Sequence, residues 1–374
     1  MKKFVIAPDS FKGSMSSIEV CNIIKTKIKQ FYPDSEVVEI PIADGGEGTS
    51  DCFIQLLGAE KVTLLSTGPY NEKLNGYYAR KDNTAILETA MFAGLPLAEG
   101  RLNPALTSTF GVGTMIRHAV ENGCREIIIG LGGSCTNDAG TGMACALGVR
   151  FINMAGEEFV PTGATLAEIA YIDTTFADRL LKDCKITAMC DIDNPMYGQT
   201  GAAHVYAPQK GANEKMVLLL DKNLADLAAT IKNQLGIDVS EIPGSGAAGA
   251  MGAGILAFLK GSLKSGIETV LDLVDFDDTI NDADVIFTGE GKIDGQSLRG
   301  KVVIGVAARA AKKNVPVIAL VGDVGEGAES AYDMGVSAIV SINRVALPFN
   351  KAKLRSQKDL ADTVEMLIRL KSIT

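Results

Sequence analysis

The sequence predicts an α/β fold in which both chain ends build one parallel sheet and the middle forms a second α/β domain. At each end, apolar runs of strand length alternate with amphipathic segments of helix length, an order typical of parallel sheets. Near residue 61 this order gives way to short strands joined by turns, and it returns near Val285. We therefore expect one domain from residues 1–65 plus 276–374 and an inserted domain from 66–275, with 105–150 open to either domain.

The first domain begins with a strand at Phe4–Ala7, a helix at Ile18–Phe31 and a second strand at Val37–Ile42. The helix has apolar residues at helical spacing on one face, and a serine precedes it as a cap. A helix near 50–57 follows the second strand. After the insertion the expected elements are strand 285–288, helix 302–312, strand 315–321, strand 338–342 and helix 357–371.

The inserted domain starts with three short strands separated by turns rich in Gly, Pro, Asn and Asp. Two histidines lie far apart in this domain, His118 in a helical pattern and His204 in a strand-like run. We expect both to be structural, because neither a histidine metal site nor a Ser-His-Asp hydrolase can be assembled from them. The expected elements are strands 62–65, 76–80 and 84–88, helix 107–121, strands 126–131 and 186–190, and helices 213–234 and 250–260.

Composition excludes several classes of function. The net charge is −9 over 374 residues, and no Lys/Arg-rich tract contains interleaved aromatics, so nucleic-acid binding is not expected. The N-terminus lacks a signal-peptide pattern, and no apolar run reaches the roughly 18 residues of a membrane span. We expect a cytoplasmic protein without a membrane partner. Seven cysteines without a C-x-x-C pair indicate reduced thiols.

Four segments are predicted to be glycine-rich loops that carry acids or amides, and most of them follow an apolar run: Asp44–Thr49, Gly130–Gly140, Gly244–Gly249 and Thr288–Asp294. Glycine lets backbone N–H groups approach a phosphate, and the N-terminus of a following helix adds a favourable dipole. Carboxylates repel phosphate unless a divalent cation lies between them. The combination indicates magnesium–nucleotide chemistry, whereas a tight strand-to-helix turn would explain any one segment alone.

Two stretches match nucleotide-binding motifs without meeting the structural requirements of those motifs. Gly244–Gly249 fits G-x-G-x-x-G, but residues 240–243 make a poor strand, so its glycines are better explained by an anion-binding helix start than by NAD binding. Residues 295–301 fit a Walker A sequence until the last position, where Val302 replaces Ser or Thr. Because that hydroxyl normally binds Mg²⁺, a P-loop is rejected. Lys301 is either a phosphate contact at a helix start or a solvated lysine.

Four carboxylates at expected strand ends could supply a magnesium site. In parallel α/β sheets, ligands bind outside the carboxyl ends of the strands. Mg²⁺ is usually held by one or two carboxylates together with substrate phosphates. The acids at these positions are Asp44, Glu47, Glu290 and Asp294, and each of them could instead only cap a helix.

Other polar residues at strand ends fit the needs of phosphoryl transfer, which requires positioning, cations and one acid. Lys12 lies beside Ser10 in the first strand-to-helix turn, where it could neutralise phosphoryl oxygens. Asp191 and Asn194 follow another apolar run, and a buried carboxylate there could take the proton of an attacking hydroxyl. An Asx-turn before Pro195 is the competing explanation.

Taken together, these motifs resemble the bacterial glycerate kinases of the two-domain, non-P-loop type. The resemblance implies a Rossmann-like domain interrupted by a second α/β domain, and Mg²⁺-dependent phosphorylation of D-glycerate by ATP in glycerate metabolism. Small departures place Cys135 where Ala is common, Ala139 where Gly is common and Ala207 where Gly is usual. The matching stretches run in the family's order over nearly the whole chain: residues 7–13, 43–49, 130–142, 190–195, 208–211, 243–249 and 288–297, with Gly300 and Lys301.

The resulting hypothesis is in-line transfer of the γ-phosphoryl group of ATP to glycerate in a cleft between the two domains, giving 2-phosphoglycerate and ADP. Lys12 and Lys301 would stabilise phosphoryl charge, and Asp44 or Glu290 would hold Mg²⁺. Asp191 is the preferred base and Asp294 the second choice. The other expected binding residues are Ser10, Asn137, Asp138, Asn194, Gly244 and Gly246, with Lys210 or Arg299 for the substrate carboxylate.

Three alternatives remain at this point. Phosphorylation at C3 would give 3-phosphoglycerate, and a different small sugar acid could be the acceptor. A non-catalytic sensor of a sugar acid or nucleotide is disfavoured, because Lys12, Asp44, Asp191, Asp294 and Lys301 are all present and no output module accompanies them.

Overall fold

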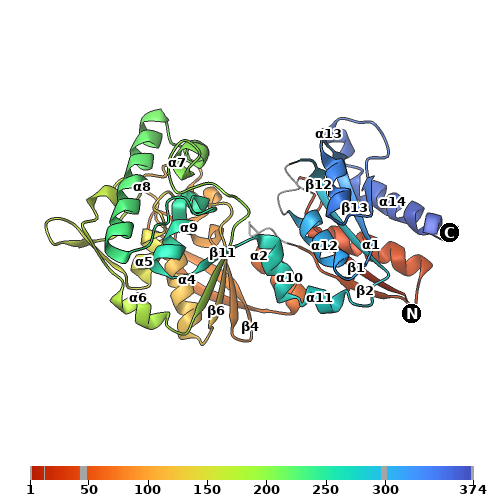
Figure 1. Cartoon of the computed structure of the whole chain (residues 1–374), viewed down its shortest axis with the longest axis horizontal. Helices are drawn as coiled ribbons and strands as arrows, with labels where there is room; N and C mark the ends of the chain where they lie inside the picture. Colours follow the sequence, from red (N-terminus) through yellow and green to blue (C-terminus); the bar gives the residue numbers. More distant parts are fainter. Residues whose placement is uncertain (1, 12, 43–48, 296–300, 372–374) are drawn as a thin grey trace. The chain divides into compact units, whose positions relative to one another are not determined.

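The computed structural model describes residues 2–11, 13–42, 49–295 and 301–371, and its contacts divide the chain into two compact units. Unit 1 contains Met1–Asp44 and Ser265–Thr374, and unit 2 contains Gly45–Lys264. One sheet comes from both chain ends and a separate sheet from the middle (Figure 1), which confirms the predicted fold class. The sequence-based domain limits, 1–65 plus 276–374 and 66–275, differ from the unit limits and stay predictions.

Unit 1 is built on a five-stranded, fully parallel sheet with the order β14-β13-β12-β1-β2. In its centre, β1 from the N-terminal part pairs with β12 from the C-terminal part, from Phe4 opposite Val285 to Pro8 opposite Gly289. The carboxyl ends of β1 and β12 therefore lie at the same edge. The strands are β1 (Lys3–Pro8), β2 (Glu36–Glu39), β12 (Val285–Ile293), β13 (Val317–Val324) and β14 (Ala338–Ser341).

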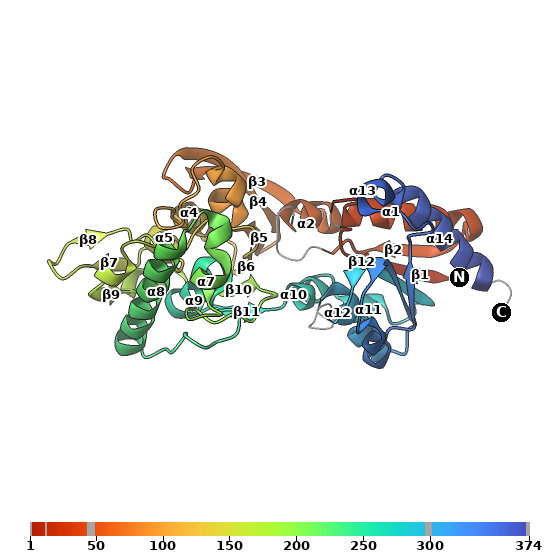
Figure 2. The ribbon, with the colours of Figure 1, turned by 90° about the horizontal axis from the view of Figure 1, so that it is seen from above.

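Helices cover both faces of this sheet. α1 packs against α14 and β1, whereas α12 packs against β12 and β13; Figure 2 shows these helices on opposite sides of the sheet. Phe4 and Phe287 from the sheet and Ile24 from α1 are buried in one cluster, and each contributes about 1.5–3 kcal/mol through burial. The helices are α1 (Ser17–Phe31), α10 (Gly266–Leu273), α11 (Phe276–Thr279), α12 (Val302–Ala311), α13 (Phe349–Ala352) and α14 (Ser356–Lys371), with a 3₁₀ helix at Ala328–Met334.

The sequence fixes the start of α1 through a capping box. The hydroxyl of Ser16 accepts the backbone N–H of Glu19 at 3.2 Å, and the carboxylate of Glu19 accepts the backbone N–H of Ser16 at 2.8 Å. Such a reciprocal pair satisfies two otherwise unpaired donors at the helix start. The predicted serine cap and the helix that follows it are confirmed.

The prediction that Thr288–Asp294 forms a loop is wrong, since β12 continues to Ile293 and pairs with β13 as far as Val324. The glycines of this segment serve strand pairing. A Cβ added to Gly289 would lie 2.1 Å from the carbonyl oxygen of Leu320 in β13, so a side chain there would push the strands apart. Glycine is required both in tight turns and where two backbones approach closely, and the sequence alone does not show which of these roles a given glycine has.

Unit 2 contains a six-stranded mixed sheet with the order β11-β10-β6-β5-β4-β3. β11, β10, β6 and β5 are parallel, and β4 and β3 continue the sheet antiparallel. The strands of this sheet are β3 (Glu60–Thr67), β4 (Lys73–Lys81), β5 (Thr84–Glu88), β6 (Glu126–Gly130), β10 (Lys185–Met189) and β11 (Ser262–Lys264).

A second, three-stranded sheet in unit 2 was not expected from the sequence, because strands of two or three residues carry no periodic pattern. Its order is β8-β7-β9, with β7 (Arg150–Ile152), β8 (Glu158–Phe159) and β9 (Tyr171–Asp173). His204 lies in helix α7, so the strand-like assignment of that run is wrong. The helices are α2 (Thr49–Leu57), α3 (Ala90–Ala93), α4 (Phe110–Glu121), α5 (Thr141–Ala146), α6 (Thr175–Leu180), α7 (Ala202–Tyr206), α8 (Glu214–Leu235) and α9 (Ala247–Phe258), with 3₁₀ helices at Leu95–Ala98, Leu166–Glu168 and Pro208–Lys210.

The remaining predicted elements are present, with ends shifted by a few residues. No helix among the described residues is long and apolar enough to span a membrane.

Candidate functional site

In unit 2, the predicted polar loops meet at the carboxyl edge of the parallel strands. Gly130 at the end of β6 lies opposite Met189 of β10 and Glu88 of β5. The loop from 131 to 140 follows β6, and the segment from 190 to 195 follows β10. Ligands of parallel α/β sheets bind at this edge. The predicted position of Asp191 and Asn194 at a strand end is therefore confirmed.

A buried carboxylate organises the loop after β6. Asp138 Oδ2 accepts hydrogen bonds from the backbone N–H and the hydroxyl of Thr109, both at 2.8 Å, and from the N–H of Gly142 at 3.3 Å. Asp138 Oδ1 accepts the N–H of Gly140 at 3.2 Å. Burial raises the pKa of Asp138, and these four donors oppose the rise by stabilising the carboxylate. Its contacts therefore fix the start of α5, and a contact with ligand stays a prediction.

Next to Asp138, the side chain of Asn137 is fully buried, and within the described part of the chain neither its oxygen nor its nitrogen has a hydrogen-bond partner. The hydroxyl of Thr136 is also buried and has no hydrogen-bond partner among the described residues. A buried polar group without a partner costs about 1–3 kcal/mol. Asn137 and Thr136 are therefore prepared to bind a ligand group or a water molecule, and Asn137 was one of the predicted ligand-binding residues.

Lys210, at the end of the 3₁₀ helix Pro208–Lys210, is only 3% exposed. Its ammonium donates to the hydroxyl of Ser134 and to the carbonyl oxygen of Thr136, both at 2.8 Å. Burial lowers its pKa to about 8, while the nearby Cys135 thiol and Asp138 act in the opposite direction. The lysine thus reaches the loop after β6 from another part of the chain.

The loops after β10 and before α9 are joined through Asn194. Its backbone oxygen accepts the N–H of Gly246 at 3.0 Å. Its side-chain nitrogen donates to the carbonyl oxygen of Thr200 at 2.8 Å, and its side-chain oxygen accepts the hydroxyl of Tyr206 at 2.6 Å. Both ends of the amide are thus engaged within the protein, and this positions the chain that carries Asp191. The expectation of a buried carboxylate at this position is wrong, because Asp191 is exposed.

Gly244 and Gly246 occupy positions where a side chain would collide with neighbouring groups. Gly244 has φ +86°, and a Cβ there would lie 2.8 Å from the sulfur of Cys190. A Cβ on Gly246 would lie 2.3 Å from the carbonyl oxygen of Pro195. The glycines therefore permit the loop before α9 to pack on the segment 190–195, and anion binding by this loop stays a prediction.

In unit 1, Ser10, Glu290, Asp294 and Lys301 lie on β1, β12 and the segments that follow the strands. The N–H of Ser10 donates to Oδ1 of Asp9 at 2.6 Å, and Lys301 is the exposed residue before the first residue of α12. Asp294 directly follows β12 and forms an ion pair with Lys292 at 3.4 Å. The structure thus places Ser10, Glu290 and Asp294 at or near the carboxyl ends of β1 and β12.

Of the two predicted magnesium ligands, Glu290 and Asp44, only Glu290 is among the residues that the structure describes. Its carboxylate is carried by β12 and is 5% exposed. The described residues contain no group of three or more His, Cys, Asp or Glu side chains that could hold a metal by themselves. A site of one or two carboxylates completed by phosphate oxygens fits magnesium nonetheless, and Glu290 supplies one carboxylate of that kind.

Three predicted site residues, Lys12, Asp44 and Arg299, lie outside the described residues, as does Glu47. Their roles stay predictions, as does the expectation of a cleft shared by the two domains.

Sequence reasoning missed Thr109, Ser134, Thr136 and Tyr206, which hold the predicted residues in place. Thr136 and Ser134 belong to a glycine-rich segment that the sequence did single out. Thr109 and Tyr206 carry no local signal, because their partners Asp138 and Asn194 are distant in sequence.

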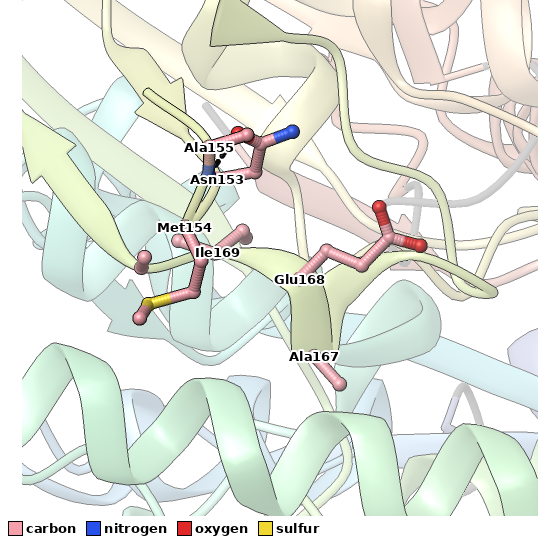
Figure 3. A pocket seen from close by; sticks show the side chains of 7 residues that line it. Asn153, Met154, Ala155, Ala167, Glu168 and Ile169 are labelled. Atoms are coloured by element: carbon pink, nitrogen blue, oxygen red, sulfur yellow. Dashed lines mark hydrogen bonds between the residues drawn. The ribbon is translucent and has the colours of Figure 1, made fainter. Parts of the chain in front are cut away.

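A separate open pocket of about 340 Å³ lies beside the small sheet, lined by 153–155 and 167–170. Figure 3 shows its side chains, including Asn153, whose oxygen accepts the N–H of Ala155 at 2.9 Å. Glu168 is its one charged lining residue. With no lining cation, this pocket is not suited to a phosphate or a sugar acid.

Comparisons with known proteins agree with the resemblance drawn from the motifs. The sequence model of the Glycerate kinase family matches residues 4–372. A glycerate kinase from Bacillus cereus (strain ATCC 10987 / NRS 248) is 44% identical over 97% of this chain and 96% of the relative. A glycerate 2-kinase from Escherichia coli (strain K12) is 43% identical over 91% of this chain and 90% of the relative.

A solved structure supports the same relationship at the level of the fold. The crystal structure of a candidate glycerate kinase 2 from Salmonella typhimurium LT2 has a TM-score of 0.88 and 37% identity, and covers 99% of this chain and 98% of that chain. The family match extends over nearly the whole chain and includes every loop described above. The chain is an enzyme that belongs to the glycerate kinase family.

Proposed function

We propose that this glycerate kinase transfers the γ-phosphoryl group of ATP to the C2 hydroxyl of D-glycerate, giving 2-phosphoglycerate and ADP. The observation that carries the proposal is the arrangement at the carboxyl edge of the unit 2 sheet. There Asp191 follows β10, while the buried amide of Asn137 follows the neighbouring strand β6. An acid that can accept a proton is thus on the same sheet edge as an amide that lacks a partner among the described residues.

In the proposed reaction, the carboxylate of Asp191 takes the proton of the C2 hydroxyl. The hydroxyl oxygen forms a bond to the γ-phosphorus, and the bond from that phosphorus to the β–γ bridging oxygen breaks, so that ADP leaves. General-base catalysis of this kind contributes about 10²–10⁴-fold. Asp191 is exposed and its side chain is at the strand end, which leaves it accessible to a small acceptor. Asp294 is the second candidate for the base.

Charge on the transferring group requires cations. Lys12 and Lys301 are the proposed contacts to phosphoryl oxygens, and Lys301 immediately precedes the N-terminus of α12. Magnesium, when bound, would neutralise phosphate oxygens and lower the cost of charge build-up. Glu290 or Asp44 would hold it. Glu290→Gln removes one carboxylate charge from this proposed set, and we expect the Mg²⁺ concentration for half-maximal activity to rise at least about tenfold.

Phosphorylation at C2 is supported by the Escherichia coli relative, which is named glycerate 2-kinase at 43% identity. Transfer to C3, or to another small sugar acid, is the alternative. The acceptor is tested by ADP release with ATP, Mg²⁺ and a panel of D-glycerate, L-glycerate, glycolate and larger sugar acids. The highest kcat/KM should belong to D-glycerate, and a higher value for another acid would overturn the substrate assignment.

The base is tested in the same assay with Asp191→Asn. We expect kcat to fall by about 10²–10⁴-fold with an unchanged fold. Asp193→Asn is the matched control, because Asp193 is exposed in the same segment, two residues further along. Near-normal turnover of the Asp191 variant would remove it from the role, and an equal loss in both variants would indicate that the segment, not the carboxylate, matters.

A further inference from the structure

The ammonium of Lys210 lies in an unusual place for a lysine. The side chain is buried, and burial of a charged group is costly unless hydrogen bonds compensate. Both hydrogen bonds that the structure gives it end on one short segment, at the hydroxyl of Ser134 and the carbonyl oxygen of Thr136. Lys210 itself belongs to the 3₁₀ helix that follows α7. Its side chain therefore connects two parts of unit 2 that are distant in sequence, since Ser134 is 76 positions away and Thr136 is 74 positions away.

The segment that Lys210 holds is fixed at several further points. The N–H of Cys135 donates to the carbonyl oxygen of Ala93 at 2.8 Å, and the carbonyl oxygen of Cys135 accepts the hydroxyl of Thr107 at 3.0 Å. The N–H of Ala139 donates to the carbonyl oxygen of Gly249 at 3.0 Å. These contacts are made by Cys135 and Ala139, on either side of Asn137 in the sequence. The side chain of Asn137 has no partner among the described residues.

The carbonyl of Thr136 is the closest link between Lys210 and Asn137. It accepts the ammonium on one side, and a Cβ added to Gly249 would lie 2.0 Å from the same oxygen. The peptide unit between Thr136 and Asn137 is therefore held between a lysine and the backbone of α9. A shift of this peptide would move the Asn137 amide directly, because the two groups share one backbone bond.

The same geometry argues against Lys210 as the main contact to a substrate carboxylate. Two of the three ammonium protons are already donated within the protein. Lys210 is 3% exposed, so the loop after β6, which it supports, would have to move before a substrate carboxylate could contact the ammonium. Its hydrogen bonds to Ser134 and Thr136 explain its burial without a bound ligand.

We infer that Lys210 is a positioning residue, which holds the Ser134–Thr136 backbone so that the Asn137 amide stays aimed at the ligand. The effect of this positioning on catalysis rests on the proposed function, whereas its effect on the loop does not. The acceptor is thus recognised by a prearranged amide, and the substrate carboxylate is neutralised by a cation other than Lys210. In this account Lys210 and Ser134 act through one structural unit and do not contribute independently.

The first test measures the loop itself and does not depend on turnover. Hydrogen–deuterium exchange of peptides covering 131–142 is compared in the wild type, Lys210→Met, Ser134→Ala and Lys215→Met. Lys215 is an exposed lysine of α8 and serves as the control. We expect at least about tenfold faster exchange in this loop for Lys210→Met and a smaller increase for Ser134→Ala. Unchanged exchange in both would overturn the inference, even for a protein whose glycerate turnover had not been found.

The second test separates positioning from direct carboxylate binding. It compares kcat/KM for D-glycerate with that for D-glyceramide, which lacks the negative charge. If Lys210 positions the loop, Lys210→Met lowers both values by a similar factor of about tenfold or more, and the preference for glycerate stays. If Lys210 binds the carboxylate, that preference collapses selectively, which would contradict the inference.

The double variant Lys210→Met/Ser134→Ala completes the cycle. Because both residues support the same peptide, the loss in the double variant should be close to that of Lys210→Met alone. Additive losses would show that they act separately and would overturn the inference. Where Lys210→Met does not fold, the exchange rates and the glycerate preference of Ser134→Ala decide the same question, since that change leaves the ammonium bonded to Thr136.

Discussion

The carboxylate of Asp138 accepts two hydrogen bonds from a single residue, Thr109, one from its backbone N–H and one from its hydroxyl, both at 2.8 Å. The pair connects the residue before α4 to the loop after β6, and the hydroxyl of Thr109 also accepts the N–H of Met143 at 2.9 Å. The start of α5 and the start of α4 are therefore fixed by one buried acid.

Asp138→Asn tests the strength of this connection. In the variant, an NH₂ group replaces one of the two carboxylate oxygens that accept hydrogen bonds from these donors. An NH₂ group cannot accept, so at least one buried N–H or O–H loses its partner. We expect a loss of about 2–3 kcal/mol in the free energy of unfolding, measured by urea denaturation. Thr109→Ser keeps both donors and should change stability much less. A loss below about 0.5 kcal/mol for Asp138→Asn would contradict the account.

Tyr206→Phe tests whether the orientation of Asn194 matters for catalysis. The hydroxyl of Tyr206 donates to the side-chain oxygen of Asn194 at 2.6 Å, and its loss frees one end of the amide. We expect kcat to fall about threefold to tenfold, in proportion to one hydrogen bond, with the KM for ATP unchanged. Tyr197→Phe is the control, since the hydroxyl of Tyr197 makes no hydrogen bond to a described residue. Equal effects of the two changes would refute this role.

Lys210 should make stability depend on pH in the alkaline range. Burial lowers its pKa from 10.5 to about 8, so the folded protein releases this proton at a lower pH than the unfolded chain. Between these values the unfolded chain binds more protons, and stability from this group rises with pH. The gain is up to about 3 kcal/mol across the window.

Comparison with Lys210→Met isolates this contribution. Burial raises the pKa of Cys135 to about 12, and Lys210 opposes this rise. The thiol therefore lowers stability in both proteins as pH rises above its ordinary pKa, and more so in Lys210→Met, which adds to the expected difference in the same direction. Urea unfolding at pH 7.5 and pH 10 should therefore show the wild type gaining relative to the variant. A stability difference that is independent of pH would show that the Lys210 ammonium titrates normally.

Ala139 has a left-handed backbone conformation in a buried position. Its φ is +51°, a region that disfavours residues with a Cβ. Ala144→Gly in α5 is the matched control, because the methyl group of Ala144 is also fully buried but its backbone is helical. Both changes remove a buried methyl group, whereas only Ala139→Gly relieves strain, so urea denaturation should show a loss about 1–2 kcal/mol smaller for Ala139→Gly. Equal losses at both positions would contradict the strain at Ala139.

The comparison of sequence and structure shows which features depend on local pattern. Strand ends follow from apolar runs, so the placement of Asp191 and Asn194 after β10 was predictable. The glycines of Thr288–Asp294 were misread, because a turn and a close strand contact select the same residue. The burial of Lys210 was not predictable, since a three-residue 3₁₀ helix carries no periodicity and its partners lie more than 70 positions away.

The position of the phosphate in the product tests the central claim most directly. The protein is incubated with ATP, Mg²⁺ and D-glycerate carrying carbon-13, and the product is identified by phosphorus and carbon NMR. The account predicts carbon–phosphorus coupling that places the phosphate on C2, with one ADP formed for each product molecule. Phosphate on C3 would contradict the proposed regiochemistry, and the absence of any phosphorylated glycerate from a folded, ATP-binding protein would contradict the function itself.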